Sequence, residues 1–94
     1  MFIVQLKFGH NKMAASEHMS GHKAWIDKGF ADGVFLMTGS IVPAAGGIVL
    51  ADGCSMDELQ ARVAADPFVV HDVVIPEIIE VAPSRVDGKI AAHG

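Results

Sequence analysis

The first residues of the chain alternate between apolar and polar side chains. The apolar positions fall at every second residue: Phe2, Val4, Leu6 and Phe8. Gln5 and Lys7 stand between them, and Gly9 follows. A period of two is typical of a strand that buries one face. We therefore predict a first strand that ends at Gly9.

The period changes in the segment from about Ala14 to Gly29. Residues of one helical face recur at spacings of three and four: Ala15, Met19, His22, Ile26 and Phe30. This spacing predicts an amphipathic helix that packs this face on a sheet. The charged residues are assigned mostly to its solvent side: Glu17, Lys23, Asp27 and Lys28.

Two short apolar runs predict further strands over residues 34–40 and 48–51, with a loop rich in glycine between them. Ser55 and Glu58 then form the Ser-x-x-Glu pattern of a capping box, which opens a helix. We expect that helix to end near Ala65.

Asp66-Pro67 stops the second helix, because a proline ring pushes the preceding residue out of the helical conformation. The last predicted strand covers residues 74–82 and contains Pro76. Proline cannot donate a hydrogen bond within a sheet, so this position is expected at an edge strand or a bulge.

The predicted order is β-α-β-β-α-β, which the right-handed crossover rule folds into a four-stranded antiparallel sheet with both helices on one face. This is an α+β, ferredoxin-like fold. Residues 1–83 are predicted to form this one domain, and residues 84–94 a tail that is flexible or contacts a partner subunit.

The composition predicts that the protein forms a homodimer. The 94 residues are 51% hydrophobic, with a mean hydropathy of +0.40, and so small a domain has a thin core. The uncovered face of the sheet is expected to carry Ile3, Gln5, Phe35 and Met37. A second copy is the natural cover for such a face, so we expect a homodimer, a dimeric α/β barrel.

Charge and cysteine content exclude several partners and locations. Seven basic residues are scattered along a chain with eleven acidic ones, for a net charge of −4, so nucleic acid is not an expected partner. No apolar run approaches the roughly 20 residues of a membrane span, and the N-terminus does not resemble a signal peptide. The single cysteine, Cys54, agrees with a cytoplasmic location and is interpreted as a small packed residue.

Two residues have both a structural and a chemical interpretation. His22 lies on the apolar helical face, where it is either a hydrogen-bonded core residue or a group that transfers protons near neutral pH. Asp66, followed by Pro67, is a favoured cap for a short helical turn, and its carboxylate could also orient a histidine from the first helix.

The remaining histidines give weaker signals. His18 and His22 are four residues apart and could share a metal ion, but a third ligand is missing, so no metal site is predicted and His18 is expected to be partly exposed. His71 could face the same cleft as Asp66. His10 and His93 lie in a loop and in the tail, where solvated side chains are expected.

The stretch GHKAWIDKGFADGVFLMTGS, followed later by AADPF, resembles the YCII-related, or YciI-like, family of small bacterial proteins over most of the chain. The family pattern is a helical histidine, a glycine turn, a strand that ends in Gly-Pro or Gly-Ser, and an Asp-Pro-aromatic motif. The corresponding positions are His22, Gly29 or Gly33, Gly39-Ser40 and Asp66-Pro67-Phe68.

This resemblance implies a ferredoxin-like dimer of the α/β-barrel type with a His-Asp pair as its active site. One characterised relative is a cofactor-free dehydrochlorinase of a chlorinated hydroxyquinol, and the wider superfamily includes muconolactone isomerases and cofactor-independent monooxygenases. The chain departs from the pattern at two positions. Met19 stands where members often have arginine, and Asp72 where glycine is common.

The resulting functional hypothesis is an enzyme without cofactor, a lyase or isomerase that acts on a small phenolic or acidic ring compound. In it, His22 transfers the proton, Asp66 holds the imidazole in one tautomer, and Ser40, Phe68 and His71 bind the substrate. The alternative is a dimeric binding or accessory protein that holds a small molecule in the same cleft without turning it over.

Overall fold

The computed structural model describes residues 1–91 and contains four strands and five helical segments in that range. The strands are β1 (Phe2–Phe8), β2 (Phe35–Ile41), β3 (Gly46–Ala51) and β4 (Val74–Glu80). The helices are η1 (Lys12–Ala14, a 3₁₀ helix), α1 (Ala15–Ala31), α2 (Met56–Ala64), α3 (Pro67–Val70) and α4 (Gly88–Ala91). The predicted β-α-β-β-α-β order is confirmed, with three short helices added.

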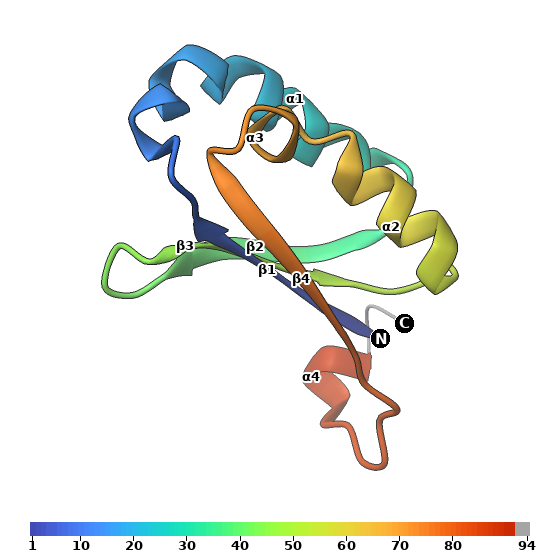
Figure 1. Ribbon diagram of the computed structural model, residues 1–94. Coiled ribbons are helices and arrows are strands. Elements are labelled where there is room, and N and C mark those ends of the chain that lie inside the picture. The colour runs from blue at the N-terminus through green and yellow to red at the C-terminus, as the bar shows by residue number, and fades with distance from the viewer. Residues whose placement is uncertain (92–94) are drawn as a thin grey trace.

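The strands form one sheet in the order β2-β3-β1-β4, and every neighbouring pair is antiparallel. Helices α1, α2 and α3 lie on one side of this sheet, and α4 lies on the other side (Figure 1). This is the predicted ferredoxin-like α+β arrangement. Within residues 1–91, no helix combines the length and the apolar character that crossing a membrane requires.

The core lies between the sheet and the helices. The alternation seen in the sequence of β1 directs one set of side chains toward the helices, where they are almost fully buried: Phe2, Val4 and Leu6. Leu59 and Val63 of α2 cover them from above, together with Phe68 of α3. Burial of each such apolar side chain contributes about 1.5–3 kcal/mol, so this layer carries much of the stability of the fold.

The opposite face of the sheet, which we call the outer face, has no helix from α1, α2 or α3 over it (Figure 1). The strand register places seven large apolar side chains on it: Ile3, Met37, Ile41, Ile48, Leu50, Ile75 and Ile79. Gln5 lies among them, as predicted, and Lys7 and Glu77 lie on the same face. The uncovered apolar face that the composition indicated is therefore present.

Phe35 was predicted on the outer face, and this prediction was wrong. Its ring is 3% exposed and makes an edge contact with Trp25 of α1, with the ring centroids 4.9 Å apart. The pairing of β2 with β3 shifts between Phe35 and Met37, which is a β-bulge. Because one extra residue reverses the alternation, Phe35 points to the helices although Met37 points outward.

The apolar face of α1 is less buried than its period predicted. Met19 is 37% exposed and Phe30 is 44% exposed, and Gly29 is the buried residue of the helix. A Cβ atom at Gly29 would lie 2.1 Å from Phe35 Cδ2, so the missing side chain is what lets the Phe35 ring approach the helix. The last turn of α1 therefore meets the sheet through glycine.

The helix boundaries follow the capping signals of the sequence. The Ser55 hydroxyl accepts from the Glu58 N–H at 3.1 Å, and the Glu58 carboxylate accepts from the Ser55 N–H at 2.9 Å, which is the predicted capping box. Helix α2 ends at Ala64, just before Asp66-Pro67. Pro76 lies in β4, an edge strand, where its missing N–H removes no bond to another strand.

The tail begins after β4, and its residues up to Lys89 are mostly exposed. Its short helix α4 stands on the outer-face side of the sheet (Figure 1). The boundary at residue 83 and the contact of the tail with a partner stay predictions. Residues 92–94, with His93, lie outside the described residues.

Candidate functional site

His22 and Asp66, which are 44 positions apart in the sequence, are joined by a hydrogen bond. The distance from His22 Nδ1 to Asp66 Oδ1 is 2.8 Å. The Asp66 side chain is completely buried, whereas that of His22 is 14% exposed. An ionised carboxylate can only accept hydrogen bonds, so beside an ionised Asp66 a neutral His22 carries its proton on Nδ1. Nε2 then has a free lone pair.

Asp66 reaches this position because it caps α3. Its backbone is extended, Pro67 occupies the first helical position, and Oδ1 also accepts from the Phe68 N–H at 3.0 Å. Gly21 precedes His22 on α1, and a Cβ atom there would lie only 3.0 Å from Pro67 Cγ. Glycine thus lets the short helix come close enough to α1 for the carboxylate to meet the imidazole.

The His22 ring is also fixed on its flat side. It stacks on the Phe68 ring with the centroids 4.0 Å apart and the planes 3° apart. Trp25 lies farther along α1, with its ring centroid 5.8 Å from that of His22 and its Nε1–H donated to the Arg62 carbonyl. The imidazole is therefore held both at one nitrogen and on one face, which limits its rotation.

A cavity of about 320 Å³ opens beside this imidazole, between α1, α3 and the helix side of the sheet. Its walls are mainly apolar, and the polar side chains that line it come from His22, Lys23, Thr38 and Ser40. Cavities of 300 Å³ or more are large enough for small ligands. The arrangement combines a hydrogen-bonded histidine with a space beside it that a small molecule can enter.

The predicted site residues divide into two groups. His22, Ser40 and Phe68 line the cavity, and Asp66 lies behind His22. His71 does not line it. The His71 ring instead stacks on that of His18, with centroids 3.8 Å and planes 4° apart, and its carbonyl accepts from Asn11 Nδ2 at 2.7 Å.

His18 and His22 turn to different partners, His71 and Asp66, although they are one helical turn apart. The His18 side chain is 22% exposed, in agreement with the expectation of partial exposure. Among residues 1–91, no group of three histidine, cysteine or acidic side chains is close enough to hold one metal ion.

Most residues of the cavity wall were not predicted as site residues from the sequence, among them Lys23, Thr38 and Met19. Lys23 was predicted on the solvent side of α1 and is exposed there, and it also lines the cavity that His22 lines. Thr38 lines it too, two residues before Ser40 in β2, so the period of two could have identified it once Ser40 was chosen. Met19, one of the two departures from the family pattern, also lies in the wall.

Asp66 Oδ2 is buried and has no hydrogen-bond partner, whereas Oδ1 has two. A buried unpaired carboxylate oxygen is costly, and such atoms are uncommon in folded proteins. Capping alone uses one oxygen, so the full burial of this side chain is not explained by the cap.

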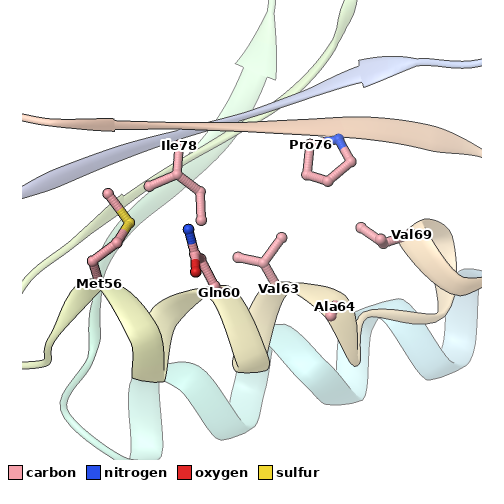
Figure 2. Close-up of a pocket in the computed structure, with 7 residues that line it drawn as sticks. All are labelled: Met56, Gln60, Val63, Ala64, Val69, Pro76 and Ile78. Atoms are coloured by element: carbon pink, nitrogen blue, oxygen red, sulfur yellow. The ribbon is translucent and has the colours of Figure 1, made fainter.

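Two other cavities offer less chemistry. One of about 310 Å³ lies between α2 and β4, where Met56, Gln60, Val63 and Ile78 face one another (Figure 2). No titratable side chain lines it. The other, of about 590 Å³, is lined by charged side chains that already have partners: Asp32 pairs with Lys28 and Arg62, and Glu58 caps α2. It also includes Cys54, but burial raises the pKa of that thiol, which disfavours the reactive thiolate.

The sequence and the structure were compared with known proteins. Residues 1–82 match the YCII-related domain. The structure is similar to that of 5-chloro-2-hydroxyhydroquinone dehydrochlorinase (TftG) from Burkholderia phenoliruptrix AC1100 in complex with 2,5-dihydroxybenzoquinone, with a TM-score of 0.71 over 87% of this chain and 94% of the other. The two are 14% identical, so this similarity shows a common fold.

A comparison with curated protein sequences gave no match. The domain match, however, spans the sheet, the helices α1, α2 and α3, and both members of the His22–Asp66 pair. The chain therefore belongs to the YCII-related domain family.

Proposed function

We propose that this protein is an enzyme without cofactor that transfers a proton on a small phenolic or acidic ring compound, as a lyase or an isomerase. The observation that carries this proposal is the 2.8 Å hydrogen bond from His22 to the buried Asp66 beside a cavity of about 320 Å³. A solvated histidine would need neither the carboxylate nor the cavity.

In the proposed reaction, His22 Nε2 takes a proton from a carbon or hydroxyl group of the substrate. The electron pair left behind forms a new double bond. In an elimination this expels a leaving group such as chloride with its own bonding pair, and in an isomerisation the imidazolium returns the proton at another carbon. Asp66 stabilises the imidazolium formed in between, because the two opposite charges are in contact.

The cavity walls have two roles in this proposal. Ser40 and Thr38 offer hydroxyl groups to a polar substituent on the substrate, and the Phe68 ring limits the rotation of the imidazole. The dehydrochlorinase activity of the structurally similar TftG supports the choice of elimination as the first reaction to test. His71 stacks on His18 outside the cavity, so it is not assigned a part here.

We also propose that two copies pair through the outer face. Its apolar side chains are otherwise open to water, and Ile75 is 61% exposed, Met37 43% and Ile79 39%. A patch of this kind on a small protein usually marks an interface.

The test is a screen of catechols, chlorohydroquinones and lactones, with both thermal unfolding and product formation as readouts. The proposal expects at least one compound to be converted, with His22→Ala slowing turnover by about 10²–10⁴-fold. If compounds raise the melting temperature but all remain chemically unchanged, the protein is a small-molecule-binding protein and the catalytic assignment is wrong.

A further inference from the structure

The charges around the cavity are of one sign. Lys23, a solvent-exposed residue, contributes the one lysine or arginine side chain of the lining, and no aspartate or glutamate lines the cavity. Asp66 is completely buried behind His22, with its charge directed at the imidazole. The chain as a whole carries a net charge of −4, so this positive lining runs against the overall charge.

Lys23 is also not engaged in an ion pair. The ion pairs of the described residues involve the N-terminal amine, Lys28, Arg62 and two histidines, and none of them contains Lys23. A second ammonium group lies close by: Lys12 Nζ is 4.7 Å from the centroid of the Phe8 ring, and Phe8 lines the same cavity. Two cations thus stand near the cavity without a carboxylate in its wall.

We infer that the cavity selects an anionic ring compound, a carboxylate or a phenolate, and that Lys23 is the residue that distinguishes it from a neutral one. This inference rests on the proposed function for its assignment of the site, and it adds the charge of the substrate. Lys23 and His22 line the same cavity, so an anionic group beside the ammonium keeps the ring within the cavity that holds the imidazole.

The apolar wall and the hydroxyl groups of the cavity also favour an anionic ring compound. Leu6, Phe8 and Ile26 provide surface against which a ring can pack, and the Ser40 and Thr38 hydroxyls can donate to an anionic oxygen. The positive charge also favours the deprotonated form of a phenol, because an opposite charge nearby stabilises the ionised state. The same charge therefore assists both binding and the removal of a proton.

The experiment compares 2,5-dihydroxybenzoate with 2,5-dihydroxybenzamide, which have nearly the same shape and differ by one charge. Their dissociation constants are measured by NMR titration of the wild type and of Lys23→Gln, Lys23→Arg and Lys28→Gln. Lys28 is the matched control, because it lies on the same helix and pairs with Asp32 at the surface outside this cavity. A His22→Gln variant shows how much of the preference for the anion comes from a charged imidazole and not from Lys23.

The wild type is expected to bind the anion about two- to fivefold more tightly than the amide, the size of one charge interaction at an exposed position. Lys23→Gln should abolish this preference, Lys23→Arg should keep it, and Lys28→Gln should not change it. Raising the salt concentration should weaken it.

Equal binding of the two probes, binding of neither, or a preference that survives Lys23→Gln overturns the inference. These outcomes do not depend on turnover. The proposed function is tested by a different result: it is wrong if no compound is converted in a way that depends on His22. The two failures can therefore be told apart.

Discussion

The Oδ1 atom of Asp66 lies 2.8 Å from His22 Nδ1, and the same atom accepts the Phe68 N–H at 3.0 Å. One oxygen thus serves both the fold of α3 and the orientation of the imidazole. The second oxygen has no partner. Because the cap fixes where Oδ1 stands, it also fixes which nitrogen of His22 carries the proton.

Asp66→Asn is expected to separate the charge of this group from its geometry. Asparagine caps helices about as well as aspartate, and to accept from the Phe68 N–H it must place its carbonyl oxygen where Oδ1 is now. His22 should therefore keep its proton on Nδ1. Proton transfer should still slow, because the amide does not stabilise an imidazolium as a carboxylate does.

The readouts are the ¹⁵N chemical shifts of the His22 ring for the tautomer, urea unfolding for stability and, once a substrate is found, turnover. Asp66→Ala is the contrasting variant, which should lose about 1 kcal/mol of capping energy and the control of the tautomer. A His22 ring that shows the same mixture of tautomers in all three proteins would mean that Asp66 only caps its turn.

Gly29→Ala is expected to destabilise the fold, although alanine normally favours a helix over glycine by about 1 kcal/mol. The new Cβ atom would lie 2.1 Å from Phe35 Cδ2, so the ring must move within a packed core. Overpacking of this kind costs typically 1–3 kcal/mol. We expect a lower free energy of unfolding, measured with urea.

A Gly29→Ala/Phe35→Leu double variant tests the cause, because the smaller side chain makes room for the methyl group. The double variant should lose less free energy of unfolding than the sum of the losses in Gly29→Ala and Phe35→Leu. Strict additivity would show that the loss at Gly29 comes from the backbone of the helix and not from this contact.

The sequence predicted those parts of the fold that depend on local rules. The capping box at Ser55, the stop at Asp66-Pro67 and the edge position of Pro76 each follow from the hydrogen bonds that a residue can or cannot make. The side on which Phe35 lies was not predictable in this way. It depends on a bulge in the pairing of β2 with β3, which no local pattern of residues marks.

The candidate site shows the same division. His22 could be chosen from its position on the apolar helical face, and Asp66 from its capping signal and the family pattern. Lys23 is exposed, as its place on the polar side of α1 predicted. Its part in the cavity wall could not be predicted from the period, because a long side chain can turn to either side of its Cα atom. The stacking of His71 on His18 depends on how α3 packs against α1, which is a tertiary contact.

Asp32 is expected to make stability depend on pH. A hydrogen bond from the Arg62 guanidinium, with help from Lys28, holds the pKa of the Asp32 carboxyl below its usual value of 3.8. A carboxyl with a lowered folded pKa contributes stability above the unfolded pKa, and that contribution is lost as the pH falls through the folded one. Asp32→Asn should therefore lower stability at pH 6, and its difference from the wild type should shrink below pH 4.

Urea unfolding of both proteins across this range measures the effect. Asp27→Asn is the control, because Asp27 is also exposed on α1 but forms no ion pair among the described residues. If Asp32→Asn lowers the free energy of unfolding by the same amount at pH 6 and at the lowest pH measured, the effect comes from packing at the end of α1 and not from the charge of Asp32.

The proposed dimer predicts that one charge on the outer face separates the subunits. Ile48 of β3 pairs with Gln5 of β1, near the middle of the outer face, and is partly buried in the single chain. In a two-fold interface Ile48→Lys introduces the charge twice, so two ammonium groups would have to give up their hydration inside the interface. Light scattering at micromolar concentration should show a dimer for the wild type and a monomer for Ile48→Lys.

Val70→Lys is the matched control, because Val70 is 57% exposed and belongs to α3 on the other side of the sheet, so this variant should remain a dimer. The melting temperature of the wild type should also rise with protein concentration, and that of the monomeric variant should not. A wild type that is monomeric at these concentrations, or a dimer that Val70→Lys dissociates and Ile48→Lys leaves intact, would show that the outer face is not the interface.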